Sequence, residues 1–156
     1  MRSRSTLLMI GLLATLLVGT QLPASLTTNP LIIAEQVKIA PALFQLDDPE
    51  SLVTVHVKFP EPYERNITDV DPSTVWLEGV IPPLNNWITQ APPEFVAQFD
   101  GNLVASIIWA KIYHMGATTQ KKAGTPVKIE LEISGNLFNG TGWQGIGLIK
   151  ILMPEL

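Results

Sequence analysis

Residues 126–134 read PVKIELEIS, and apolar and charged side chains alternate through this stretch without a break. Four apolar residues fall on one face of an extended chain: Val127, Ile129, Leu131 and Ile133. A two-residue period is typical of a strand that buries one face and exposes the other. Residues 53–59, VTVHVKF, repeat the pattern. The two stretches together predict sheets that pack face to face.

Shorter apolar runs flank these two stretches, and turn-forming residues separate them. The runs lie at residues 37–40, 43–46, 75–79, 95–99 and 145–152. Short strands with turn residues about every 8–12 positions are typical of an antiparallel β-sandwich. We therefore expect an all-β fold, Ig-like or jelly-roll-like, with about seven to nine strands.

Residues 103–115, LVASIIWAKIYHM, are compatible with two structures. The dipeptide Asp100-Gly101 stands between two apolar runs, which is the pattern of a β-hairpin. Ile107, Ile108 and Trp109 favour a strand after that turn. The length of the segment leaves a short helix as the alternative. Four prolines in residues 82–94 argue against a helix there.

The chain begins with the pattern of a secretory signal peptide. Arg2 and Arg4 precede an uncharged apolar run from Leu7 to Val18, as in such signals. A bilayer span takes about 20 residues, so a signal peptide over residues 1–24 is favoured over an uncleaved anchor. We expect residues 25–36 to form a tether and residues 37–156 to form the sandwich of a secreted or cell-surface protein.

The composition excludes several classes of function. The chain has no cysteine and a net charge of −4. Without cysteine it can form neither disulfides nor thiolate metal sites. An acidic balance without a basic patch argues against nucleic acid as a partner.

Two segments carry a resemblance to a known family. In DVDPSTVWLEG the matching residues are Asp71, Ser73, Thr74, Val75, Leu77 and Gly79. In the last segment they are Val127, Ile129, Leu131, Ile133, Gly135, Leu137, Gly140, Thr141, Trp143, Gly145 and Ile149. In this order, over residues 50–152, they resemble a small secreted β-sandwich module of archaeal and bacterial surface proteins.

The resemblance implies an extracellular module, found within larger surface or secreted proteins, with no known enzymatic activity of its own. In the family an acidic loop of calcium-binding type follows the middle segment. Here that loop is reduced to residues 98–102, QFDGN. One carboxylate and one amide are too few for calcium, which takes about six to eight oxygen ligands, so we do not carry calcium over.

The local patterns do not indicate a catalytic, cofactor or metal site. Residues 140–145 fit G-x-G-x-x-G by count, but a strand follows them instead of the helix that a dinucleotide site needs. His56 and His114 are far apart in the sequence, with no third zinc ligand at a local spacing. Neighbouring aspartates, such as Asp69 and Asp71, are typical of turns.

Aromatic residues and glycosylation triplets are the remaining candidates. Trp76 and Trp143 could bind a ligand or an interface if exposed, but core or edge packing is favoured for each. Trp76 alternates with Val75 and Leu77, so it is expected on the outer face if those two are core. Asn66 and Asn139 begin N-x-T triplets in expected loops and are candidate glycosylation sites.

We therefore expect a non-enzymatic exported β-sandwich that acts as a surface structural or adhesion module. Its expected partners are other surface proteins, copies of itself or glycans, and it would contact a membrane only through an uncleaved signal segment. One alternative is a filament subunit that donates residues 31–38 to the sheet of a neighbouring copy. The other is a carbohydrate-binding module that uses exposed tryptophans.

Overall fold

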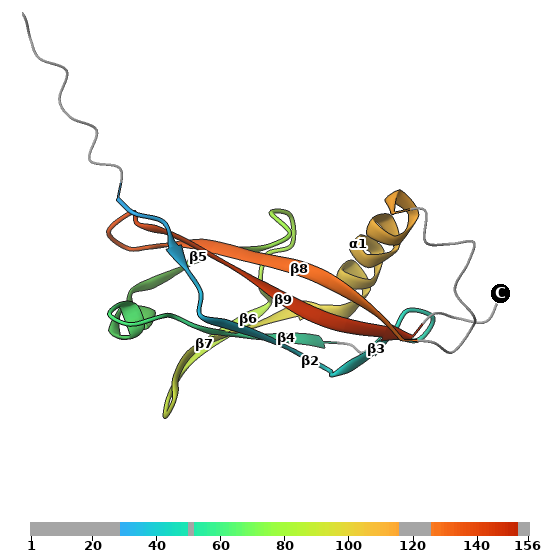
Figure 1. Ribbon diagram of the computed structural model, residues 1–156, viewed down its shortest axis with the longest axis horizontal. Helices are drawn as coiled ribbons and strands as arrows, with labels where there is room; N and C mark the ends of the chain where they lie inside the picture. Colours follow the sequence, from blue (N-terminus) through green and yellow to red (C-terminus); the bar gives the residue numbers. More distant parts are fainter. Residues whose placement is uncertain (1–28, 50–51, 116–125, 153–156) are drawn as a thin grey trace, which may run out of the picture.

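The computed structural model describes residues 29–49, 52–115 and 126–152. Two β-sheets lie face to face, and a single described α-helix stands at one end of them (Figure 1). The predicted β-sandwich is thus confirmed as a two-sheet, mainly antiparallel architecture. The signal segment expected over residues 1–24 lies outside the described residues.

The first sheet is built around two long strands. β8 (Pro126–Leu137) and β9 (Gly142–Leu152) form a hairpin, and β5 (Val70–Leu77) pairs antiparallel with β8. Two short strands run parallel to β9 along its other edge: β1 (Ile32–Ile33) at residues 143–144 and β3 (Leu43–Gln45) at residues 150–152. The order is therefore β1 or β3, then β9, β8 and β5.

The second sheet has four antiparallel strands in the order β2-β4-β7-β6. Its central strands are β4 (Leu52–Lys58) and β7 (Pro93–Asp100). β2 (Gln36–Ala40) and β6 (Asn85–Gln90) form the two edges. Prolines stand on both sides of β6 and none inside it. Residues 82–94 thus contain no helix, as the prolines predicted, and the strand within them was not predicted.

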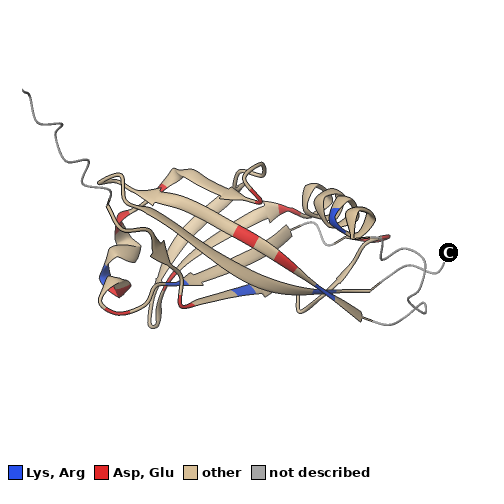
Figure 2. Ribbon diagram, turned by 45° about the horizontal axis from the view of Figure 1, so that its top comes forward, with Lys and Arg blue, Asp and Glu red and all other residues tan. Residues whose placement is uncertain are grey.

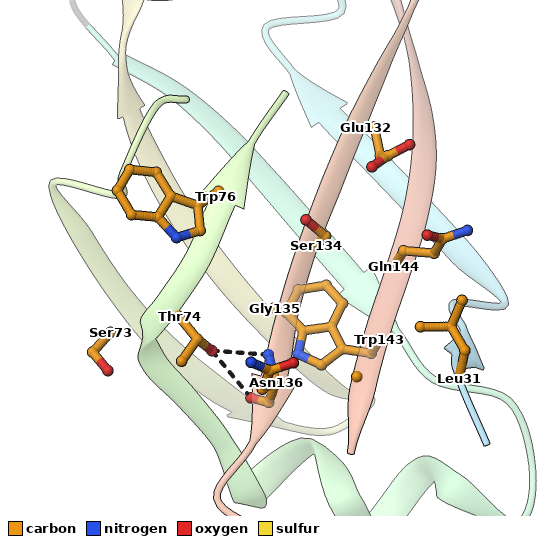
Figure 3. A pocket seen from close by; sticks show the side chains of 11 residues that line it. Leu31, Ser73, Thr74, Trp76, Glu132, Ser134, Gly135, Asn136, Trp143 and Gln144 are labelled. Carbon is orange, nitrogen blue, oxygen red and sulfur yellow. Dashed lines mark hydrogen bonds between the residues drawn. The ribbon is translucent and has the colours of Figure 1, made fainter. Parts of the chain in front are cut away.

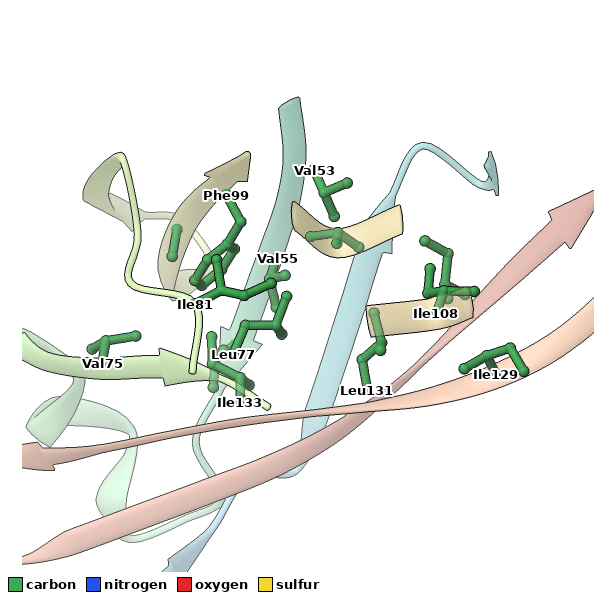
Figure 4. Packing of buried hydrophobic residues seen from close by; sticks show 14 of the residues in the cluster. Val53, Val55, Val75, Leu77, Ile81, Phe99, Ile108, Ile129, Leu131 and Ile133 are labelled. Carbon is green, nitrogen blue, oxygen red and sulfur yellow. The ribbon is translucent and has the colours of Figure 1, made fainter. Parts of the chain in front are cut away.

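The hydrophobic core fills the space between the sheets (Figure 4). Both alternating stretches behave as the two-residue period predicts. In β4 and just after it, the inward residues have no exposed surface: Val53, Val55, Val57 and Phe59. In β8 the inward residues are also buried: Val127, Ile129, Leu131 and Ile133.

The N-terminal segment changes sheet twice. Its first strand, β1, belongs to the first sheet, β2 to the second and β3 again to the first. The Ala34 amide donates to the Gln144 carbonyl at 2.8 Å, and the Glu35 amide donates to the Lys58 carbonyl at 2.8 Å. Part of the stretch expected as a tether is therefore strand. Residues 31–38, considered as a donor segment, pair within their own chain at β1 and β2.

The prediction of a strand over residues 103–115 is wrong. Residues Gly101–His114 form helix α1, and no hairpin forms at Asp100-Gly101. Asp100 is the helix N-cap: its Oδ1 accepts hydrogen bonds from the amides of Asn102 at 2.9 Å and Leu103 at 3.1 Å. The inward residues of α1 follow a helical spacing, with Val104, Ile108 and Ile112 fully buried. Burial at this spacing outweighs the weak β preference of the side chains.

The polar connection after β4 also contains a helix. Residues Tyr63–Asp69 form the 3₁₀ helix η1, which begins directly after Pro62. Its one buried residue, Ile67, joins the core. Neither of the two helices that the structure describes, η1 and α1, is long and apolar enough to cross a membrane.

Candidate functional site

A groove opens on the outer face of the first sheet, where β5 separates from β8 (Figure 3). The pairing of the two strands passes from Asp71↔Asn136 directly to Trp76↔Ser134. Residues 72–75 of β5 therefore bulge opposite the single residue Gly135 of β8. The groove has a volume of about 530 Å³. We call it the Trp76 groove and define it by Leu31, Ser73, Trp76, Ser134, Asn136 and Gln144.

Hydrogen bonds hold the bulge in shape. The Thr74 hydroxyl accepts a hydrogen bond from the Asn136 amide and donates one to the Asp71 carbonyl, both at 2.8 Å. The Asp71 carboxylate accepts from the Ser73 amide at 3.0 Å and from the Ser73 hydroxyl at 2.7 Å. This is an Asx turn, in which a side chain satisfies the backbone that has left the ladder. These hydrogen bonds therefore fix the shape of the β5 side of the groove.

Three strands contribute side chains in one row across the sheet. Trp76 is paired with Ser134, and Ser134 is paired with Gln144. Asn136 and Glu132 lie two residues to either side of Ser134 on β8, so they share its outward face. Figure 3 shows the Trp76 indole and the Leu31 side chain on opposite sides of these polar groups.

Trp76 is the exposed aromatic residue of the groove. Its relative exposure is 39%, whereas Val75 and Leu77 on either side are each 1% exposed. The prediction that Trp76 faces outward if its neighbours are core is therefore confirmed. An indole in this position offers a large, rigid surface at low entropic cost, together with one N–H donor.

The groove contains little charge. Among the residues that line it, Glu132 is the only ionisable one. Lysines gather outside the groove: Lys128 is paired with Lys150 where Figure 2 shows blue on β8 and β9, and with Lys38 they line a separate hollow. Electrostatics therefore favours a neutral or cationic ligand over an anionic one.

Trp143 is not available as a binding residue. It is 1% exposed, and its ring packs in the core against Phe59 at 5.5 Å and Phe95 at 6.0 Å between ring centroids. Trp143 is paired with Gly135, and a Cβ on Gly135 would lie 2.9 Å from the indole Cζ2. Trp143, a candidate ligand or interface residue only if exposed, therefore packs in the core, because the indole occupies the inward space that this glycine leaves.

The spacing of apolar residues in the sequence indicated the burial of Trp143. Trp143 stands at even spacing from Ile149 and Ile151, and all three face inward in β9. The indole Nε1 is buried and has no hydrogen-bond partner among the described residues. Such a donor costs about 1–3 kcal/mol, which the aromatic contacts offset in part. Apart from Trp76, the residues that define the groove gave no comparable sign, because the bulge and the strand register bring them together.

The remaining candidate residues lie apart from the groove. The His56 Nδ1 lies 3.0 Å from a carboxylate oxygen of Glu94 on the outer face of the second sheet, while His114 ends α1. In the part of the chain that the structure describes, no three histidine, aspartate or glutamate residues are close enough to hold a metal. Gly140 has a φ of +84° in the turn between β8 and β9, so residues 140–145 form a turn and the start of a strand.

The two glycosylation candidates occupy different surroundings. Asn139 is exposed in the β8–β9 turn, and its side-chain oxygen accepts a hydrogen bond from the Thr141 amide at 2.9 Å. Asn66 is half-buried within η1. Glycosylation at either residue stays a prediction.

Comparison of the chain with protein-family models, with curated proteins and with solved structures finds no match.

Proposed function

We propose that the protein is an extracellular adhesion module that binds neutral glycans in the Trp76 groove. The observation that carries the proposal is the row formed by Trp76, Ser134 and Gln144, in which an exposed indole stands beside polar side chains. Sugar rings have an apolar face and a rim of hydroxyl groups. An aromatic ring with hydrogen-bonding groups beside it is complementary to both.

The polar groups of the groove suit hydroxyl ligands. Ser73 and Ser134 carry hydroxyls, and Asn136 and Gln144 carry amides, so each side chain can both donate and accept hydrogen bonds. The row lies on paired strands, and the turn of β5 is fixed by Asp71 and Thr74. A ligand would therefore meet groups that are already positioned, which lowers the entropic cost of binding.

The single carboxylate of the groove suits a site that binds a neutral sugar and does not cleave it. Glycoside hydrolysis ordinarily uses two carboxylates on either side of the scissile bond, and Glu132 is the single ionisable residue that lines the groove. An acidic sugar would meet this carboxylate, and no lysine or arginine is among the described residues that line the groove. Export by the N-terminal segment would place the groove outside the cell, where glycans are available.

Tryptophan fluorescence tests the proposal. We expect neutral oligosaccharides at millimolar concentration to shift or quench the emission of the native protein, because one of its tryptophans would stack on the sugar. Trp76→Ala should abolish the saturable part of the change. Sialylated oligosaccharides should give a weaker response than neutral ones.

A second tryptophan provides the matched control. Trp109 on α1 is 37% exposed, close to the value for Trp76, and lies outside the groove. Trp109→Ala should leave the saturable change in place. Equal loss in both variants, or no saturable change with any neutral oligosaccharide in a broad panel, would contradict the proposal.

A further inference from the structure

The outer edge of β6 is the least protected sheet edge in the part of the chain that the structure describes. β6 ends the order β2-β4-β7-β6, so one of its sides has no strand partner among the described residues. An edge strand presents unpaired amide and carbonyl groups that can pair with another strand. Proteins ordinarily block such edges with charges, prolines, bulges or short strands.

The strands that end the sheets elsewhere each carry one of these protections, and the part of β8 beyond β5 carries Lys128, Glu130 and Glu132. On the outer side of β9, β1 and β3 leave only residues 145–149 without a strand partner among the described residues. β1 and β3 are only two and three residues long. β5 contains Pro72 and the bulge opposite Gly135. β2 contains Lys38, and its start is flanked by the ion pair between Glu35 and Lys58, at 2.7 Å.

β6 lacks all four protections. It is six residues long, contains no proline and pairs with β7 without a register shift from Asn85 to Gln90. No charged residue occurs between Glu78 and Glu94. Trp87 in the middle of the strand is 40% exposed, and Leu84 just before it is 63% exposed. A regular, uncharged edge with exposed apolar side chains is suited to strand pairing.

We propose that β6 pairs antiparallel with β6 of a second copy, so that two four-stranded sheets become one continuous sheet. A second copy fits because an uncharged strand meets no like charge when it is placed against itself. The pairing is isologous, because each chain contributes the same β6 edge to it. The assembly therefore closes as a dimer and does not grow into a filament.

The geometry of antiparallel pairing places Trp87 at the junction. Residues directly opposite one another in an antiparallel pair point to the same face. Trp87 would therefore meet an outward-facing residue of the second β6, which is Asn85, Trp87 or Thr89 by strand alternation. The inference does not depend on the Trp76 groove, which lies on the other sheet.

The mass of the native protein in solution is the first test. Sedimentation equilibrium should give a dimer that dissociates on dilution, and a monomer at about 100 μM or above would overturn the proposal. Trp87→Lys should raise the dissociation constant at least about tenfold, since it removes an aromatic contact and places like charges near each other. Trp109→Lys, at a similarly exposed tryptophan of α1, should leave the mass unchanged.

Two further measurements locate the pairing on β6. Asn85→Lys places a positive charge on β6 at an exposed residue outside the core cluster, and it should also weaken the dimer. This variant tests the pairing even if Trp87→Lys fails to fold. An equimolar mixture of Trp87→Lys and Trp87→Glu should contain more dimer than either variant forms alone. A dimer whose dissociation constant is unchanged in Trp87→Lys, Trp87→Glu and Asn85→Lys would contradict pairing through β6.

Discussion

At the scale of single residues, two glycines set how closely β2 and β9 approach. Gly145 and Gly147 are on the inward face of β9, where β2 of the second sheet crosses over β9. A Cβ on Gly145 would lie 2.5 Å from Val37 Cγ2 and 2.7 Å from the Ala34 Cβ. A Cβ on Gly147 would lie 2.8 Å from side-chain carbons of Val37 and Ile39. The sequence showed these glycines as part of a strand but not their role.

We expect Gly145→Ala to lower the free energy of unfolding by about 1–3 kcal/mol, because the added methyl group overpacks the crossing. Urea unfolding of the two proteins measures the difference. Ile146→Ala is the matched control: this neighbour in the same strand is 58% exposed, and its loss should change stability by no more than about 0.5 kcal/mol. Equal effects of the two substitutions would contradict this account of the crossing.

Lys58 provides a prediction about pH. A hydrogen bond from its ammonium group to the Glu35 carboxylate raises the pKa of Lys58, although partial desolvation opposes the shift. Because the pKa is higher in the folded state, the contribution to stability is complete below the ordinary lysine pKa. It is lost as the pH rises through the higher folded value.

The difference in unfolding free energy between the native protein and Lys58→Met should therefore stay constant from about pH 7 to pH 9. It should shrink only above about pH 10. Urea unfolding across this range checks the prediction. A difference that disappears between pH 7 and pH 9 would contradict the assignment to the lysine.

At the scale of elements, Asp100 determines that a helix begins directly after β7. Its side chain caps α1 through the amides of Asn102 and Leu103. We expect Asp100→Ala to cost about 1 kcal/mol of stability, within a range of about 0.5–2. Asp100→Asn, which keeps the accepting oxygen, should cost less. The two variants can be compared by thermal unfolding, and equal losses would argue against the cap.

A side chain of α1 also forms hydrogen bonds along the part of the β8 edge that β5 does not cover. β5 ends at Leu77, and beyond it the Lys111 ammonium donates to the Glu130 carbonyl of β8 and to the Glu78 carboxylate, both at 2.8 Å. The same carboxylate oxygen accepts from the Glu132 amide at 2.7 Å. Side chains thus satisfy the backbone where no strand continues. We expect Lys111→Met to leave the Glu130 carbonyl unpaired and to speed amide exchange in β8.

The sequence predicted the strands well because burial on one face imposes a two-residue period. That period identified the inward faces of β4 and β8 and the outward direction of Trp76. It failed for α1, where an Asp-Gly pair that often forms a hairpin begins a helix instead. It also could not show the groove, because the β5 bulge depends on contacts between Thr74 and Asn136, which are distant in the sequence.

At the scale of the whole molecule, the two sheets carry different features on their outer faces. The first sheet carries the Trp76 groove, and the second ends in the unprotected edge of β6. If both proposals hold, each dimer has two glycan sites, and a multivalent surface would be bound more tightly than a single oligosaccharide. Stability comes from the shared core between the sheets, so changes at either surface feature should leave the fold intact.

The most direct test of the glycan proposal is a titration of the isotope-labelled protein with the neutral oligosaccharide that gives the largest fluorescence change. Amide and indole shifts in two-dimensional NMR spectra report where the ligand binds. The account predicts saturable shifts at Trp76, Ser134, Asn136 and Gln144, with β6 unaffected. Saturable shifts that cluster elsewhere, or none at millimolar ligand, would contradict the proposal that the Trp76 groove is the binding site.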